Sequence, residues 1–254
     1  MIRLICKDKI FSDIQAIFFD KDGTIEDSRI YLNQLVTERI RLLSVHKFGI
    51  VDHLPKTFGF KADKIDPKGL MAVGSRKDNE LAAAALIASS GCGWYQAREI
   101  AHQAFEQAAK NITPTKESSP MFPGTLPLLQ ELIKAKCQLG IISADSLTGI
   151  NRFVEQEQIK DYFKVLVGSD RDLQKPDPKL YLKACKNLNV EPQNTLMVGD
   201  SMGDIIMAKQ AGAAGTIGIC WENPDTDHLS SADIAITHLE DIKILDKPTN
   251  YLIA

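Results

Sequence analysis

A short apolar run that ends in two aspartates and a glycine constrains this chain more than any other feature. The run is Ile17–Phe19, and it leads directly into Asp20, Lys21, Asp22 and Gly23. An apolar run of this length, bounded by charge and glycine, favours a buried strand over a helix. Glycine lets the backbone turn sharply out of a strand, so we expect both aspartates at the carboxyl end of a central strand, where open α/β sheets bind ligands.

Two carboxylates only one residue apart, Asp20 and Asp22, repel each other. The repulsion falls if one of them is protonated or if a cation lies between them, and both states serve phosphoryl chemistry. The alternative interpretation is a strand-to-turn junction in which Asp and Gly are present for turn formation alone. The remainder of the chain favours the first interpretation.

Strand and helix patterns alternate in the C-terminal half of the chain. Strand patterns cover residues 139–143, 163–168, 195–199 and 216–220, and helical patterns cover 125–136, 147–158, 178–188 and 204–211. This alternation predicts an α/β fold, a Rossmann-like parallel sheet with helices on both faces. At the N-terminus, Ile2–Cys6 predicts a short strand that is followed by a charged turn.

The stretch 28–119 shows no clear strand and no such alternation. It contains helical patterns at 30–47, 79–89 and 94–110, of which the last two are rich in alanine and other helix formers. We therefore predict a smaller α-helical domain at 28–119, inserted after the first strand of a core domain that comprises 1–27 and 120–254.

Composition excludes several classes of function. Thirty Lys and Arg against 33 Asp and Glu give a net charge of −3, which argues against nucleic-acid binding. No apolar stretch is long enough to span a membrane, and the first residues lack the apolar core of a signal peptide. The five cysteines are scattered without a C-x-x-C pair, which indicates free thiols, no zinc site and a cytoplasmic protein. The sequence makes no prediction of the oligomeric state.

The segment D-K-D-G-T-I-E-D-S, which starts at Asp20, resembles the first motif of the haloacid dehalogenase superfamily, whose members are mostly phosphatases. Further segments resemble its later motifs in the same order. They are Ser143 after the strand pattern L-G-I-I, Lys175 in K-P-D-P, and Asp200 and Asp204 in G-D-S-M-G-D. A helical cap inserted just after the first motif is a common arrangement in this superfamily.

Each matching residue also has a purely structural interpretation. A serine after a strand can cap the next helix, although Asp145 or Ser146 can do this in place of Ser143. A loop lysine is usually solvated, and an aspartate in the first turn of a helix favours the helix dipole. The common order of the motifs, each after a strand pattern, favours the functional interpretation.

The resemblance implies a two-step phosphoryl transfer. Asp20 attacks phosphorus and forms an aspartyl-phosphate, and Asp22 protonates the leaving oxygen and then accepts a proton from water. Thr24, Ser143 and Lys175 are assigned to substrate binding, with Thr24 also orienting either the loop or Asp22. The position of Lys21 is variable in the family pattern, and no role is assigned to it.

The resemblance also implies a magnesium ion. Asp20, the backbone carbonyl of Asp22, and Asp200 would hold Mg²⁺, and Asp204 would be a ligand or would orient Lys175. We expect these four carboxylates to converge with only Lys175 opposing them. A phosphate dianion would then need a divalent cation to enter.

The predicted function is a Mg²⁺-dependent phosphatase that acts on a small phosphorylated metabolite, either phosphoglycolate-like or a sugar phosphate. Asp22 favours a phosphate ester, because dehalogenases and phosphonatases lack this acid. The alternative is a sugar phosphomutase of the β-phosphoglucomutase type, which uses the same residues. A non-catalytic binding module is less favoured, because such proteins usually lose the nucleophile or a metal carboxylate.

The inserted segment offers candidates for substrate contact. Arg76 and Lys77 would grip a substrate carboxylate or second phosphate, or they are a solvated pair at a helix start. Trp94 and Tyr95 would shape a pocket, or they pack the helical insert.

Overall fold

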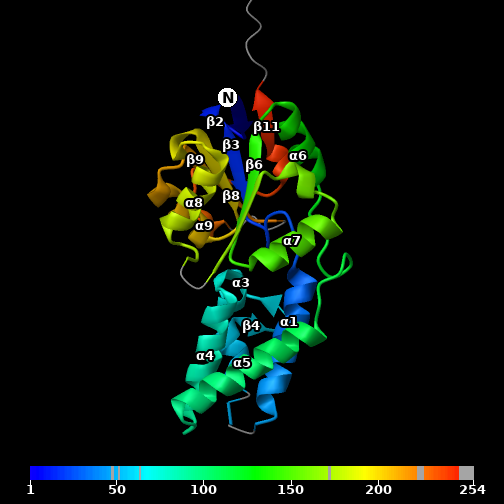
Figure 1. Cartoon of the computed structure of the whole chain (residues 1–254), viewed down its shortest axis with the longest axis vertical. Helices are drawn as coiled ribbons and strands as arrows, with labels where there is room; N and C mark the ends of the chain where they lie inside the picture. The colour runs from blue at the N-terminus through cyan, green and yellow to red at the C-terminus, as the bar shows by residue number, and fades with distance from the viewer. Residues whose placement is uncertain (47–48, 51, 63, 171–172, 222–225, 246–254) are drawn as a thin grey trace, which may run out of the picture. The chain divides into compact units, whose positions relative to one another are not determined.

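The computed structural model describes all residues except 47–48, 51, 63, 171–172, 222–225 and 246–254 (Figure 1). The chain divides into two compact units. Unit 1 comprises Met1–Glu26 and Met121–Ala254, and unit 2 comprises Asp27–Pro120. Among the described residues, no helix has both the length and the apolar character needed to cross a bilayer.

Unit 1 is built on a six-stranded parallel sheet with the order β10-β9-β8-β3-β6-β7. Its strands are β3 (Ala16–Phe19), β6 (Gln138–Ser143), β7 (Val165–Gly168), β8 (Thr195–Gly199), β9 (Gly215–Ile219) and β10 (Ile234–Ile236). The predicted α/β fold is therefore confirmed, although β10 was not predicted. The apolar run Ile17–Phe19 lies in the central part of this sheet, because β3 is between β6 and β8.

Helices cover both faces of the sheet (Figure 1). Ile17 and Phe19 of β3 pack with α6 (Thr125–Lys134) and α7 (Leu147–Gln156), which belong to the same buried cluster. Phe18 points to the opposite face and packs with α8 (Pro178–Leu188) and α9 (Met202–Ala211). Alternate residues of one strand thus serve two cores, which explains why its sequence is continuously apolar. Short 3₁₀ turns complete the unit: η1 (Lys160–Tyr162), η2 (Pro192–Asn194), η3 (Asp227–Leu229) and η4 (Leu239–Asp241).

Capping residues place the starts and ends of these helices. The Asp177 side chain accepts a hydrogen bond from the Lys179 amide and caps α8, with proline in the first turn. Ser146 caps α7 by accepting from the Gly149 amide, which leaves Ser143 without a capping role. Gly212 ends α9 in the left-handed region, with φ of 84°.

A second, antiparallel sheet in unit 1 joins the two ends of the chain. It has the order β11-β1-β2 and contains β1 (Ile2–Cys6), β2 (Lys9–Ile14) and β11 (Ile242–Leu245). The predicted strand at Ile2–Cys6 is confirmed, and the charged turn expected after it lies at Lys7 and Asp8. The strand β2, which follows this turn, was not predicted. Only Phe11 and Ile14 of β2 are buried, so its spacing does not show the alternation of a typical strand. Residues 246–254 of the tail lie outside the described residues.

Unit 2 is mainly helical and has its own buried cluster. Its elements are α1 (Arg29–Ser44), α2 (Leu54–Phe58), β4 (Phe60–Lys61), β5 (Lys64–Ile65), α3 (Leu70–Val73), α4 (Arg76–Ser89) and α5 (Trp94–Asn111). The expectation of no strand in this segment was wrong, because β4 and β5 form a small antiparallel pair. Buried alanines on α4 and α5 carry little bulk, which allows these two helices to pack closely.

Candidate active site

Three strands of the parallel sheet bring the predicted site residues to one edge. Asp20 follows β3, Ser143 ends β6, and Asp200 follows β8. The Asp20 amide donates a hydrogen bond of 2.8 Å to the Val198 carbonyl, which holds the start of the loop against β8. The site therefore lies at the carboxyl ends of adjacent parallel strands, where α/β sheets bind ligands.

Three carboxylates meet at this edge. Asp20, Asp200 and Asp204 each offer an oxygen, and these oxygens lie within 4.8 Å of one another. Asp204 is fully buried and Asp20 is 6% exposed. Asp204 is oriented by Ser201, whose hydroxyl donates a hydrogen bond of 2.6 Å to it as part of a capping box at the start of α9.

Lys175 bridges two of these carboxylates. Its Nζ lies 2.7 Å from Asp20 Oδ1 and 2.6 Å from Asp204 Oδ1, and its side chain is 6% exposed. Burial acts to lower the pKa of Lys175, but Asp20 and Asp204 outweigh burial and raise it above its usual value. The ammonium therefore stays charged at neutral pH and lies between the Asp20 and Asp204 carboxylates.

The cluster carries more negative charge than Lys175 can offset. Burial raises the pKa of Asp20 to about 7, against the lowering effect of Lys175, and Asp204 and Asp22 raise it further. Burial also raises the pKa of Asp200 well above its usual range, with Asp20 and Asp204 adding to the effect. A cation that joins the carboxylates would oppose both shifts, and oxygen ligands suit a hard divalent ion. The residues present therefore fit a metal site.

Gly23 leaves the space that the Asp200 carboxylate occupies. It has φ of +72°, and an ideal Cβ on it would lie 1.9 Å from Asp200 Oδ2. A side chain at this position would displace the carboxylate and would also strain the backbone. The glycine that ends the strand pattern thus serves both the turn and the site.

We expect the substitution Gly23→Ala to weaken divalent-ion binding at least about 10-fold and to lower the free energy of unfolding by about 1–3 kcal/mol. The reason is the collision of the new Cβ with Asp200 together with the left-handed backbone. Calorimetric titration with Mg²⁺ and urea unfolding measure the two effects. Gly49→Ala is the matched control, because Gly49 also has a positive φ, +69°, but nothing lies within 4 Å of its ideal Cβ. Equal Mg²⁺ affinity in both variants would contradict the prediction.

The two predicted hydroxyl ligands lie at the same edge and are buried. Ser143 is 1% exposed, and its Oγ accepts a hydrogen bond of 3.1 Å from the Asp145 amide. Thr24 is fully buried, and its Oγ1 has no hydrogen-bond partner among the described residues. The Thr24 carbonyl accepts a hydrogen bond of 3.3 Å from Trp221 Nε1, which ties the loop to the segment after β9.

Lys21, for which no role is predicted from the sequence, is one of the most buried charged residues in this region. Its side chain is 3% exposed, and its Nζ lies 2.8 Å from Asp22 Oδ2, contacts Glu26, and lies 3.4 Å from Asp145 Oδ2. The expectation that Lys175 alone opposes the four aspartates is therefore wrong. The signal available in the sequence was a lysine between two aspartates with a glutamate five positions later, a pattern that also fits a solvated loop.

The candidates in unit 2 lie on α4 and α5. Arg76 pairs within its own unit, 2.5 Å from Glu106 and 3.8 Å from Glu80, so its charge is offset there.

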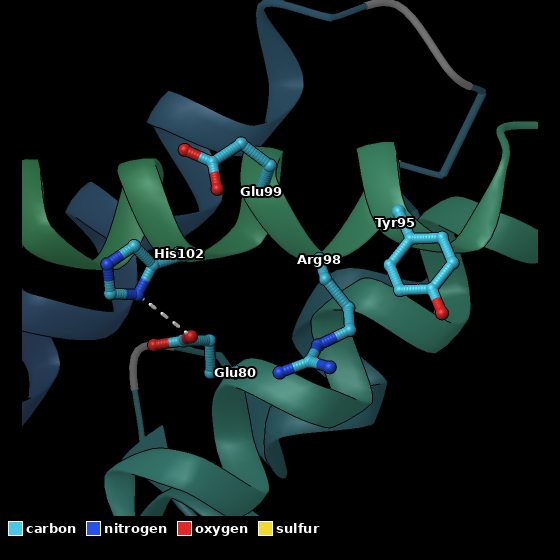
Figure 2. Close-up of a pocket in the computed structure, with 5 residues that line it drawn as sticks. All are labelled: Glu80, Tyr95, Arg98, Glu99 and His102. Carbon is cyan, nitrogen blue, oxygen red and sulfur yellow. Dashed lines mark hydrogen bonds and ion pairs between the residues drawn. The ribbon is translucent and has the colours of Figure 1, made fainter.

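Trp94 is 44% exposed and Tyr95 is 85% exposed. A surface depression of about 230 Å³ is lined by Glu80, Tyr95, Arg98, Glu99 and His102, which are drawn as sticks in Figure 2. His102 Nδ1 lies 3.1 Å from Glu80 Oε1 across this depression.

Comparisons with known proteins identify, for most of the chain, the same family that its sequence motifs resemble. The family model for haloacid dehalogenase-like hydrolases matches residues 14–212. The chain is 26% identical to phosphoglycolate phosphatase 1 of Pseudomonas aeruginosa, over 90% of this chain and 78% of that protein. It is 32% identical to the probable phosphatase IndB of Dickeya dadantii over 44% of this chain, and this match spans only 49% of that relative.

A solved structure shares the fold. The structure described as a predicted phosphoglycolate phosphatase from Haemophilus somnus 129pt superposes with a TM-score of 0.66 at 18% identity, over 89% of this chain and 95% of that one. At this identity the likeness concerns the fold alone, and it covers both the six-stranded sheet and the helical insertion.

Proposed function

Because the chain belongs to the haloacid dehalogenase-like hydrolases, we propose that it is a Mg²⁺-dependent phosphatase acting on a small phosphorylated metabolite. The observation that carries the proposal is the buried group of Asp20, Asp200 and Asp204, with Lys175 in contact with two of them, at the carboxyl edge of the sheet. Buried carboxylates gathered around one lysine suit the binding of a dianionic group together with a metal.

Asp20 is the nucleophile in this proposal. One of its carboxylate oxygens forms a bond to phosphorus as the bond between phosphorus and the ester oxygen breaks, and the phosphoryl group is then carried by Asp20. Lys175, 2.7 Å from Asp20 Oδ1, is placed to neutralise the transferring oxygens, and the Ser143 hydroxyl donates to them. A divalent cation held by Asp20, Asp200 and the Asp22 carbonyl, with Asp204 as a further candidate ligand, would offset the charge of the phosphoryl group.

Asp22 is the acid and base. It gives its proton to the leaving alkoxide in the first step and accepts one from the attacking water in the second, after which Asp20 and orthophosphate separate. Asp22 suits this role because its side chain is 27% exposed and lies outside the buried carboxylate group. Thr24 supports the loop that carries Asp22 through its carbonyl, which accepts a hydrogen bond from Trp221 Nε1.

The substrate class is proposed from the relatives. A curated relative that matches along 90% of this chain is named phosphoglycolate phosphatase 1, which favours a small phosphorylated acid, and a sugar phosphate is the second possibility. We propose that unit 2 acts as the cap that chooses between such substrates, as helical inserts after the first motif do in this family.

The direct test is orthophosphate release from a panel that contains 2-phosphoglycolate, sugar phosphates and nucleotides, with the Asp20→Asn variant as the control. Release from one class of compound by the natural protein alone supports the proposal and names the substrate. No release from any compound contradicts it. In that case a phosphorylated Asp20 trapped from a sugar phosphate would point to a mutase, and failure to trap one would point to a binding module.

We expect activity to fall about 100-fold or more when divalent ions are removed with a chelator, and to return when Mg²⁺ is added in excess. The physical reason is that a phosphate dianion entering beside Asp20, Asp200 and Asp204 meets a net negative charge that Lys175 alone does not offset. Steady-state phosphate release measures the effect, and added Ca²⁺, a larger cation, is the control for simple charge screening. Full activity after chelation would contradict the metal assignment.

A further inference from the structure

The loop that follows β3 is built around the buried ammonium of Lys21. Its Nζ lies 2.9 Å from Asp22 Oδ1 and 2.8 Å from Asp22 Oδ2, so it contacts both oxygens of that carboxylate. The same Nζ contacts Glu26 and lies 3.4 Å from Asp145 Oδ2. A buried ammonium destabilises the fold unless it is paired, and the Lys21 side chain, 3% exposed, has three carboxylate partners and also lies 5.9 Å from the centroid of the Phe153 ring.

The backbone of Lys21 organises the same loop. Its carbonyl accepts hydrogen bonds from the amides of Thr24, Ile25 and Glu26, at 3.3, 3.1 and 2.9 Å. The Gly23 amide donates a hydrogen bond of 2.9 Å to the Glu26 carbonyl and closes the turn. Lys21 and Glu26 are therefore held at a fixed separation by the main chain as well as by their side chains.

Two of the three partners anchor Lys21 independently of Asp22. Glu26 is 3% exposed and forms backbone bridges with Asp22 and Met121. Asp145 follows β6, and its Oδ1 accepts a hydrogen bond of 2.6 Å from the Ser146 amide. The ammonium thus lies between the loop after β3 and the loop after β6. Of its carboxylate partners, Glu26 is buried, whereas the side chains of Asp22 and Asp145 are 27% and 32% exposed.

We propose that Lys21 is a positioning residue for Asp22, which rests on the proposed function of Asp22 as acid and base. Lys21 holds both carboxylate oxygens and so limits the rotations of a side chain that is 27% exposed. A proton donor acts only from a narrow range of positions, so loss of this restraint lowers proton transfer while Asp20 and the metal ligands stay in place.

The choice of ester separates this role from a merely structural one. An alkyl phosphate has a poor leaving group that needs the proton from Asp22, whereas 4-nitrophenyl phosphate has a stable leaving group that does not. The value of kcat/KM includes the steps up to release of the first product and therefore responds to this acid. We expect Lys21→Met to lower kcat/KM for the best alkyl ester about 10- to 100-fold more than for 4-nitrophenyl phosphate.

The variant Asp22→Asn sets the scale for this measurement. It should show the same dependence on the leaving group with a larger magnitude. The double variant with Lys21→Met should show no further change in the ratio of the two kcat/KM values, because Lys21 acts through Asp22. An independent, multiplied effect on this ratio in the double variant would overturn the proposal.

The test includes a control variant outside the loop and a second variant of Lys21. Tyr181→Phe removes a buried hydrogen bond of 2.8 Å to Thr195, which is the first residue of β8 and lies at the other end of the sheet from the loop of Lys21. This variant should leave the ratio of the two kcat/KM values unchanged, whatever its effect on the melting temperature. If Lys21→Met does not fold, Lys21→Arg keeps the charge but places its donors differently and should shift the ratio in the same direction.

The possible failures are distinguishable. If the natural protein and Asp20→Asn release no phosphate from either ester, the proposed function itself is overturned, and the role of Lys21 with it. If the natural protein is active, Asp20→Asn is inactive, and Lys21→Met lowers kcat/KM equally for both esters or for neither, only the role of Lys21 is overturned.

Discussion

The substitution Asp20→Asn should abolish phosphate release, with a loss of roughly 10⁴-fold or more, and should leave the fold intact. The amide has no anionic oxygen to attack phosphorus, so no aspartyl-phosphate can form. The fold should survive because Lys175 keeps Asp204 as a partner, at 2.6 Å. The effect is measured by phosphate release in Mg²⁺ and by trapping of the phosphorylated enzyme. The matched control is Asp13→Asn, at an exposed position in β2.

The Asp20→Asn variant should also show how the buried carboxylate of Asp20 makes the stability of the metal-free protein depend on pH. Burial raises the pKa of Asp20 from 3.8 to about 7, so between these values the folded protein holds a proton that the unfolded chain releases. The natural protein without divalent ions should therefore lose stability as the pH rises through this interval, and the asparagine variant should lose less. Urea unfolding at several pH values in chelator measures the difference. A variant whose stability falls as steeply as that of the natural protein would contradict this account.

The substitution Lys175→Met should be the most destabilising change at the site, lowering the free energy of unfolding by about 3–5 kcal/mol. It removes the buried cation that Asp20 and Asp204 share and leaves their carboxylates uncompensated. Phosphate release should fall with it, because in the proposed mechanism the same ammonium neutralises the transferring oxygens. Unfolding in urea with and without Mg²⁺ measures the effect, and added Mg²⁺ should recover part of the lost stability.

Lys209→Met is the control for loss of a lysine ion pair. Its side chain is 46% exposed and lies 3.8 Å from Asp233, so its loss should cost about 1 kcal/mol or less. Similar effects of the two substitutions would show that Lys175 is not held in a buried pair.

Local signals in the sequence were sufficient for the core of unit 1. The bounds of β8 and α8 follow from an apolar run that ends in Gly199 and from Asp177 followed by Pro178, and the structure has both elements as predicted. The edge strand β10 and the strand β2 were missed. Both are short or have few buried residues, and their extended conformation is stabilised by neighbours that are distant in the chain.

The site was predictable to the extent that strand ends meet at one edge of a parallel sheet. Asp20, Ser143 and Asp200 follow adjacent strands, so their closeness required only the strand order. The burial of Lys21 was not predictable in this way. It depends on Asp145, which comes from a different loop, and on the turn that directs Glu26 inward.

The two connections that lead to unit 2 leave unit 1 side by side. Glu26 and Met121 form an antiparallel bridge, and the Phe122 amide donates a hydrogen bond of 3.0 Å to the Ile25 carbonyl. The whole segment 27–120 therefore occupies the position of a hairpin loop, and its buried cluster is its own. We expect this segment to be exchangeable: a short turn in its place, or the insert of a relative, should leave the parallel sheet and its carboxylates assembled. If unit 2 selects the substrate, as proposed, substrate preference can then change while the carboxylate group stays the same.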